Sequence, residues 1–140
     1  MKSKVFLDTN VIIDFLETTR KRNKEAIQTI AVLVKNDCDI FISEDMLTTI
    51  SYIVKKKREV LAFFQEILAH SNWHIVPFGT EVIKNAIAYT LKSGSDLEDV
   101  LQCFCAKEHK CDIFLTNDKK FVDCGVEILD YDTFLKDRDG

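Results

Sequence analysis

Short apolar runs alternate with segments of helical periodicity along the whole chain. The runs are rich in Val, Ile and Phe and are too brief for helices, which is typical of buried strands. Between them, apolar residues recur at spacings of three and four, as they do on one face of a helix. We predict strands at 5–7, 39–42, 73–76, 112–116 and 126–129, and helices at 25–35, 43–58, 59–70, 81–91, 96–107 and 131–135. This alternation predicts the α/β class, with a parallel sheet covered by helices.

The helices carry their own local predictions. Ile27, Ile30 and Val34 are spaced to share the buried face of the helix over 25–35. Ser43 is the predicted N-cap of the following helix. The basic run 55–58 is predicted to close that helix, because the helix dipole favours cations at its C-terminal end.

Length and composition predict one globular unit. A chain of 140 residues with 46% hydrophobic residues is expected to form a single domain over 1–140, with 136–140 as a frayed tail. No apolar run approaches the roughly 18–20 residues that cross a membrane, so no membrane association is predicted. The first predicted strand begins too close to the N-terminus to leave room for a signal peptide.

The cysteines predict buried thiols. Five cysteines are an odd number for a chain with a full-size core, which favours reduced thiols and a cytoplasmic protein. Cys103, Cys105, His109 and Cys111 lie near one another in sequence, but their spacing fits no standard zinc ligand set. Buried thiols are therefore the preferred interpretation of these residues.

Asp8 lies where the first buried strand ends. A carboxylate at that point is costly to desolvate unless a cation or a helix N-terminus meets it. Ligands of open α/β sheets bind just outside the carboxyl ends of the strands, which makes Asp8 a candidate site residue. Alternatively, Asp8, Thr9 or Asn10 only caps the next helix. The sequence leaves both interpretations open.

Asp118 follows the fourth predicted strand as Asp8 follows the first. These two strands lie side by side in a doubly wound sheet whose strand order reverses between them, and both carboxylates would then reach one crevice. The alternative is a simple turn, because Asn117-Asp118-Lys119 is common turn composition.

The helix predicted over 96–107 supplies further acids. Ser95 and Glu98 fit a capping box, which assigns Glu98 a structural role. Asp99 instead shares a helix face with Cys103, and a carboxylate on a core-facing side needs a partner. Asp96 lies three residues earlier, and it serves either the helix dipole or the same site.

Converging carboxylates repel one another unless a cation lies between them. Mg²⁺ and Mn²⁺ prefer oxygen ligands, and they support phosphodiester hydrolysis by activating water and neutralising charge on the leaving oxygen. The net charge of −4 argues against a basic coat protein for nucleic acid, but it is compatible with a nuclease that holds cations. The basic runs 20–24 and 55–58 are interpreted as solvated segments, with contact to RNA phosphates as the alternative.

Three stretches, 6–14, 96–102 with Ala106, and 114–121, carry a family resemblance when taken in this order. The chain resembles the PIN-domain family of metal-dependent nucleases. Within it, the chain is similar to the bacterial branch that includes the toxin ribonucleases of toxin–antitoxin modules. The resemblance implies a Rossmann-like, three-layer α/β/α fold with a central parallel sheet of about five strands, a Mg²⁺ or Mn²⁺ site, and RNA cleavage.

The resemblance also implies roles for individual residues. Asp8, Asp99 and Asp118 fall on the acidic positions that bind metal and carry catalysis. Asp96 belongs to the motif of this branch and is a further candidate ligand. The polar residues expected beside the ligands are Asn10, Thr116, Asn117 and Thr49.

One position departs from the family pattern. Many members carry an acid partway along the helix after the second strand, and the register places Thr49 there. Glu44 or Asp45 compensates, or Thr49 coordinates through water, or metal binding is weak. Glu44 therefore stays among the candidate ligands.

Three functions follow for testing. The first is a metal-dependent endoribonuclease, the toxin of a toxin–antitoxin pair, with RNA as substrate, an antitoxin protein as partner and a homodimeric state. The second is a catalytically weakened PIN-fold module that binds RNA or a protein partner. The third is a phosphatase with Asp8 as nucleophile, which ranks last because Asn10 stands where that chemistry uses a second acid.

Overall fold

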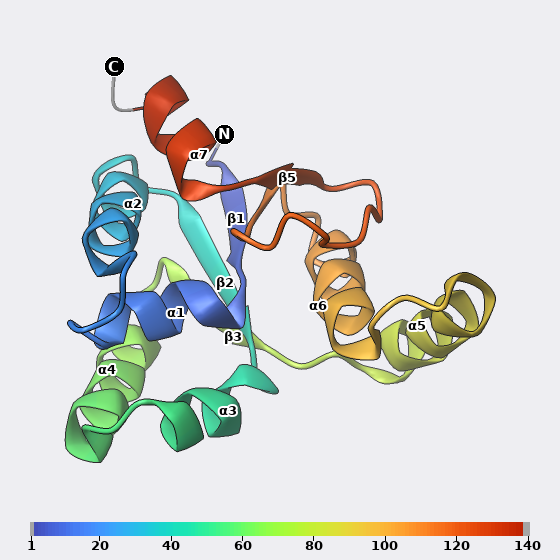
Figure 1. Cartoon of the computed structure of the whole chain (residues 1–140), viewed down its shortest axis with the longest axis horizontal. Helices are drawn as coiled ribbons and strands as arrows, with labels where there is room; N and C mark the ends of the chain where they lie inside the picture. The colour runs from blue at the N-terminus through green and yellow to red at the C-terminus, as the bar shows by residue number, and fades with distance from the viewer. Residues whose placement is uncertain (1, 139–140) are drawn as a thin grey trace.

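The computed structural model describes residues 2–138. Its centre is a five-stranded parallel sheet in the order β3-β2-β1-β4-β5, as Figure 1 shows. The strands are β1 (Lys4–Leu7), β2 (Asp39–Ser43), β3 (Trp73–Val76), β4 (Ile113–Leu115) and β5 (Glu127–Leu129). The prediction of an α/β fold with a central parallel sheet of five strands is therefore confirmed.

The strand order reverses between β1 and β4. From β1 the chain moves outward through β2 and β3, and it then returns to the other side of β1 with β4 and β5. Leu7 pairs with Leu115 in the parallel register of β1 and β4, so the residues that follow these strands emerge next to each other. This is the point at which open α/β sheets bind ligands.

Helices cover both faces of the sheet and complete the predicted three-layer α/β/α arrangement. Figure 1 shows α1, α2 and α4 on one side and α5 and α6 on the other. The helices are α1 (Thr9–Leu16), α2 (Asn23–Lys35), α3 (Met46–Ile53), α4 (Lys57–Ala69), α5 (Thr80–Ser93), α6 (Leu97–Glu108) and α7 (Tyr131–Arg138). No helix among residues 2–138 is both long and apolar enough to cross a membrane.

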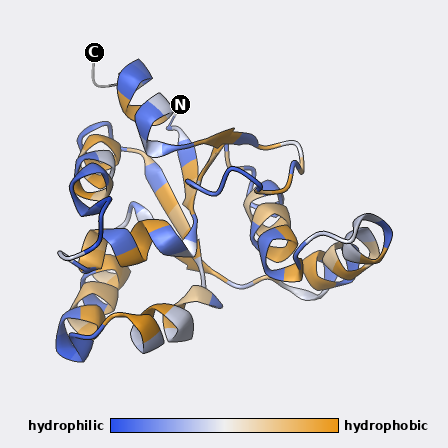
Figure 2. Ribbon diagram, in the orientation of Figure 1, coloured by the Kyte–Doolittle hydropathy of each residue, from blue (hydrophilic) through white to orange (hydrophobic). Residues whose placement is uncertain are grey.

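The core lies along the central strands, whose residues are mostly hydrophobic (Figure 2). Phe6 of β1 and Phe114 of β4 stack with their ring centroids 5.3 Å apart, and Phe121 stacks on Phe114 at 4.4 Å. This aromatic stack lies beneath the loop that follows β4. It anchors that loop to the sheet, because stacked aromatic rings bury a large apolar area in a defined geometry.

The predicted inner face of α2 is only partly right. Ile30 is buried, but Ile27 and Val34 are 44% and 57% exposed, and the helix instead buries Ala26 and Leu33. Both sets of residues recur with helical spacing, so periodicity alone could not choose between neighbouring faces. The choice was made by how α2 packs against α1 and α7.

The boundaries of α3 and α4 differ from the prediction. Ser43 is the buried last residue of β2, and α3 begins at Met46, so the predicted N-cap is wrong. α3 ends at Ile53, and Lys57 and Arg58 belong to the first turn of α4. The expected cation at the end of α3 is nevertheless present, because Lys57 Nζ donates to the carbonyl oxygen of Val54 at 2.7 Å. A lysine from the first turn of α4 thus binds the C-terminal end of α3.

The start of α6 and the end of α7 also differ from the prediction. α6 is capped by Asp96, whose Oδ1 accepts from the backbone N–H of Asp99 at 3.1 Å, and not by Ser95. The predicted capping box of Ser95 and Glu98 is therefore wrong. α7 extends to Arg138, so the predicted frayed tail over 136–140 overlaps the helix at 136–138, and its last two residues lie outside the described residues.

The prediction of five reduced thiols is wrong for one pair. Cys103 of α6 and Cys124, in the loop before β5, form a disulfide across 21 residues of sequence. The loop after β4 folds back over α6, and the spacing of the cysteines in the sequence does not predict this long-range contact. Cys105 and Cys111 remain buried thiols, and burial raises the pKa of each to about 12.

Candidate metal-binding active site

Asp8 is held at the carboxyl end of β1 by both of its oxygens. Oδ1 accepts from the backbone N–H of Thr9 at 2.8 Å, which caps α1, and Oδ2 accepts from the Thr116 hydroxyl at 2.8 Å. The backbone N–H of Asp8 donates to the carbonyl oxygen of Leu115 at 2.9 Å. Asp8 therefore caps the helix and also faces the residues that follow β4, so the two interpretations left open by the sequence are compatible.

Asp118 lies in the turn after β4. Its backbone N–H donates to the Thr116 hydroxyl at 3.1 Å, and its Oδ1 accepts from the backbone N–H of Lys120 at 2.9 Å. Thr116 thus contacts both Asp8 and Asp118. An open cleft of about 470 Å³ is lined by Asp8, Asn10, Asp14, Arg20, Lys21, Arg22, Asn117 and Asp118. The two strand-end acids and the predicted polar neighbours Asn10 and Asn117 therefore share one cleft.

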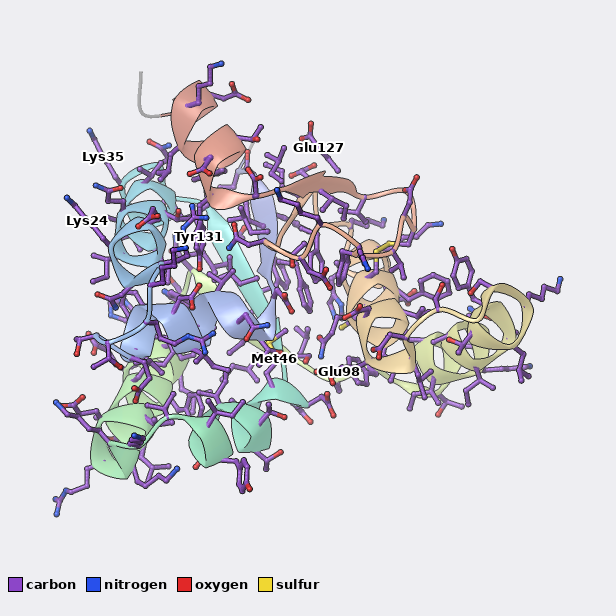
Figure 3. The ribbon with its side chains drawn as sticks, viewed as in Figure 1. Lys24, Lys35, Met46, Glu98, Glu127 and Tyr131 are labelled. Carbon is purple, nitrogen blue, oxygen red and sulfur yellow. A yellow bond between two sulfur atoms is a disulfide. The ribbon has the colours of Figure 1, made fainter. Side chains whose placement is uncertain are left out.

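α6 adds carboxylates at its N-terminal end. Asp99 lies in its first turn, half-buried, three residues after the Asp96 cap. Glu98 stands at the same N-terminal end of α6 (Figure 3). α6 packs against β2, which lies beside β1 in the sheet, and the charges of Asp8 and Asp118 act on Asp99 in its first turn.

The pKa values record this crowding of negative charge. Burial, followed by the charges of Asp96, Asp8, Asp118 and Glu98, raises the pKa of Asp99 from 3.8 to about 6. Burial also raises the pKa of Asp8, against the opposing effect of the Thr116 and Thr9 hydrogen bonds. The pKa of Glu98 is raised by burial and by the charges of Asp45, Asp96 and Asp8. Carboxylates from β1, α6 and the turn after β4 therefore interact electrostatically, as pairs that repel.

Other predicted residues have different environments. The Asn117 side-chain oxygen accepts from the backbone N–H of Tyr131 at 3.0 Å, which ties the turn to the start of α7. Glu44 is exposed and Thr49 is half-buried, and among the described contacts neither meets the strand-end acids. Asp45 is the acid of this segment that approaches α6, because it accepts from Gln102 at 3.4 Å.

The donor set fits a hard divalent cation. Carboxylate oxygens are the ligands that Mg²⁺ and Mn²⁺ prefer. Burial and, after it, repulsion from neighbouring carboxylates raise the pKa of Asp99, and a bound cation would offset both effects. Within residues 2–138, no three His, Cys, Asp or Glu side chains are close enough together to hold a metal as they stand. Mg²⁺ is commonly held by one or two carboxylates, with water and substrate phosphates completing its shell, so such a group is not required.

Comparison with known proteins now identifies the family. A match to the PIN domain spans residues 5–126, from β1 to the loop before β5. The chain belongs to the PIN domain family. The resemblance in the three sequence stretches is therefore confirmed. The matched region includes Asp8, Asp99 and Asp118.

Proteins similar to this PIN domain in sequence or in fold include a ribonuclease and toxins. Ribonuclease VapC1 of Aquifex aeolicus is 36% identical over 137 residues, which cover 95% of this chain and 94% of that protein. A crystal structure of Mycobacterium tuberculosis VapC20, described as a sarcin-ricin loop cleaving toxin, superposes with a TM-score of 0.71 at 12% identity, over 87% of this chain and 95% of that one. VapBC2 of Rickettsia felis, bound to a DNA fragment from its promoter, gives a TM-score of 0.66 at 18% identity, over 91% and 98%.

The structure adds residues to the cleft of this PIN domain that sequence reasoning missed. Asp14 is buried in α1, and it accepts from the Tyr131 hydroxyl at 2.7 Å and from Arg20 Nε at 3.0 Å. A signal was present, because Asp14 interrupts the apolar run of α1 and a buried charge needs partners. The sequence did not reveal which residues those partners are, since Tyr131 lies 117 residues away.

Proposed function

We propose that this PIN domain is a metal-dependent endoribonuclease that hydrolyses RNA phosphodiester bonds, and that it is the toxin of a toxin–antitoxin pair. The observation that carries the proposal is that Asp8 and Asp118 share one cleft at the strand-order reversal, near Asp99 of α6. Burial first, and then the charges of neighbours that include Asp8 and Asp118, raise the pKa of Asp99 to about 6. The sequence relationship to a protein named as a ribonuclease supports the same reaction. Asp96 is a further candidate ligand through its position beside Asp99.

The chain's own residues prepare the site for this reaction. Thr116 and the N-terminus of α1 fix both oxygens of Asp8, so this carboxylate enters the cleft in one orientation. Thr116 also holds the backbone of Asp118, which keeps the two acids in register. Asp99 lies on α6, and burial together with neighbouring carboxylates raises its pKa to about 6. Mg²⁺ or Mn²⁺, when bound by these residues, would supply an activated water and neutralise charge on the leaving oxygen.

Calorimetric titration of Mn²⁺ and Mg²⁺, paired with cleavage of a mixed RNA, tests the proposal. The wild type is expected to bind the metals and to cleave, and the double variant Asp8→Asn/Asp99→Asn is expected to do neither. Glu127→Gln, which removes a charge from an exposed position of β5, is the matched control and should behave as the wild type. Cleavage that survives in the double variant would show that the site lies elsewhere.

A second candidate, a catalytically weakened module that binds RNA or a protein, is favoured by one observation. Thr49 occupies the position at which many PIN domains carry an acid, and neither Thr49 nor Glu44 is among the residues that line the cleft of the strand-end acids. Thr49→Glu separates the two candidates. If Thr49→Glu greatly raises metal affinity and cleavage, the natural protein is the weakened module. If the wild type already cleaves strongly and Thr49→Glu changes little, the result supports the full enzyme.

An antitoxin partner and a homodimeric state are part of the proposal. Structures similar in fold include toxin–antitoxin complexes. Several large apolar side chains are exposed on the helices, as expected for a chain that buries surface against a partner. Those exposed by more than 60% are Tyr52, Leu61, Leu68 and Leu91. Light scattering of the purified chain, alone and after co-expression with its antitoxin, measures both associations, and a monomer in both cases would contradict them.

The whole chain, 1–140, is proposed to act as one PIN-like domain in the cytoplasm, where an RNA substrate would be met. The Cys103–Cys124 disulfide argues in the other direction, because the cytosol keeps thiols reduced. Alkylation of cysteines in rapidly quenched cells measures which state is present. Full alkylation of this pair would fit the cytoplasm, and complete protection would favour an oxidising compartment.

A further inference from the structure

The lining of the cleft that holds the strand-end acids carries charges of both signs. Asp8 and Asp118 contribute carboxylates, and residues 20–22, between α1 and α2, contribute the cations Arg20, Lys21 and Arg22. An RNA backbone that approaches the acids meets repulsion from them before a metal is bound. Cations in the lining of the same cleft would offset that repulsion.

The three cations are engaged to different degrees. Arg22 donates to Glu25 at 2.6 Å and to Asp132 at 2.9 Å, and its guanidinium lies 5.3 Å from the centre of the Tyr131 ring. Arg22 therefore links α2 to α7 and is committed to the fold. Lys21 is exposed and has no partner in the described contacts.

Arg20 is anchored on one edge only. Its Nε donates to Asp14 Oδ1 at 3.0 Å, and one terminal nitrogen donates to Asn10 Oδ1 at 3.4 Å. Asp14 is itself fixed, because it is buried and its other oxygen accepts from the Tyr131 hydroxyl. The side chain of Arg20 remains 39% exposed, against 10% for Asp14. A guanidinium has five N–H donors, so most of its donors are left for a ligand.

We propose that Arg20 binds a phosphate of the RNA substrate in this cleft, and that Asp14 is the residue that positions it. A planar guanidinium with one edge fixed presents its other edge in the geometry that pairs with two phosphate oxygens. Lys21 adds a mobile charge next to it. The inference rests on the proposed ribonuclease function and extends it, because it names the group that holds the backbone while the acids act at the bond.

Kinetics of RNA cleavage give the first test. Arg20→Gln is expected to raise KM about tenfold and to change kcat by less than about twofold, because a contact to a non-reacting phosphate contributes uniform binding. Arg20→Lys should recover part of the loss, since it keeps the charge and lacks the fork. Lys24→Gln is the control, because Lys24 projects from α2 away from the sheet (Figure 3) and does not line the cleft.

RNA binding in EDTA gives a readout that does not depend on cleavage. The probe is a fluorescein-labelled single-stranded RNA, followed by anisotropy between about 50 and 200 mM salt. Loss of one phosphate contact should make the slope of log K against log salt less negative by about 0.7 for Arg20→Gln. Asp14→Asn should weaken binding with the slope unchanged, because it releases the guanidinium without removing its charge. Melting curves establish that each variant is folded.

The outcomes separate this inference from the proposed function. Wild-type cleavage with the same KM for Arg20→Gln and Lys24→Gln overturns the Arg20 proposal and leaves the ribonuclease standing. RNA binding without cleavage overturns the ribonuclease, and the salt slopes still decide on Arg20. A wild type that neither binds nor cleaves RNA overturns both.

Discussion

Replacing Asp99 with Asn is expected to stabilise the metal-free protein at neutral pH, although it removes a proposed metal ligand. Burial and four neighbouring carboxylates raise the pKa of Asp99 from 3.8 to about 6 in the folded state. Ionising this carboxyl therefore costs the folded state free energy that is absent in the unfolded chain. Asn has nearly the same shape and carries no charge, so the substitution removes that cost.

The size of the gain follows from three contributions. The full shift sets an upper limit of about 3 kcal/mol, since one pKa unit corresponds to about 1.4 kcal/mol. Asp99 is only partly buried, so solvent screening lowers this figure substantially. The lost attraction between the carboxylate and the N-terminus of α6 subtracts roughly 0.3–1 kcal/mol. We expect a net gain of about 1 kcal/mol, or a rise in melting temperature of roughly 3–4 °C.

The gain has a required dependence on pH. The folded state keeps the Asp99 proton up to about pH 6, whereas the unfolded chain releases it near 3.8. The native state therefore binds more protons in this window, and wild-type stability falls as the pH rises through it. The advantage of Asp99→Asn is expected to be full above about pH 7, about half as large near pH 5, and about a fifth as large near pH 4.

Urea unfolding in EDTA across this pH range measures the effect. Glu127→Gln is the control, because it removes one negative charge from an exposed position of β5. Equal stabilisation by both variants would mean that net charge, and not the crowding at Asp99, is responsible. A gain for Asp99→Asn that persists unchanged near pH 4 would refute the reasoning. Added Mn²⁺ is expected to stabilise the wild type more than the variant.

Further predictions concern the long-range contacts that shape the cleft. Reducing the Cys103–Cys124 disulfide with a dithiol is expected to lower the free energy of unfolding by about 3 kcal/mol, because it frees a loop of 21 residues in the unfolded chain. Urea unfolding with and without the dithiol measures this loss. Tyr131→Phe should lower the free energy of unfolding by about 1–3 kcal/mol, because it removes the hydroxyl that donates to an oxygen of buried Asp14. Thermal melts compare this variant with Tyr52→Phe, whose tyrosine is exposed. Lys57→Gln is expected to cost about 1 kcal/mol by exposing the last carbonyl groups of α3, and its effect on unfolding should shrink in high salt.

The sequence by itself determined the order of strands and helices. A strand needs only a brief β-prone apolar run, and a helix needs only spacing of three and four, so both signals are local. The positions of Asp8 and Asp118 after β1 and β4 were local signals for the same reason. Because a parallel sheet with a reversal of strand order places such strand ends together, these two candidates followed without coordinates.

The tertiary structure decided what depends on packing between distant segments. It chose Leu33 over Val34 for the inner face of α2, and it placed Asp96 instead of Ser95 at the start of α6. It also joined residues far apart in sequence, as in the disulfide of α6 and the contact between Asp14 and Tyr131. Helical periodicity is nearly the same for neighbouring faces, and sequence distance carries no information on which buried charge meets which hydroxyl. Those choices are made only when the elements pack against each other.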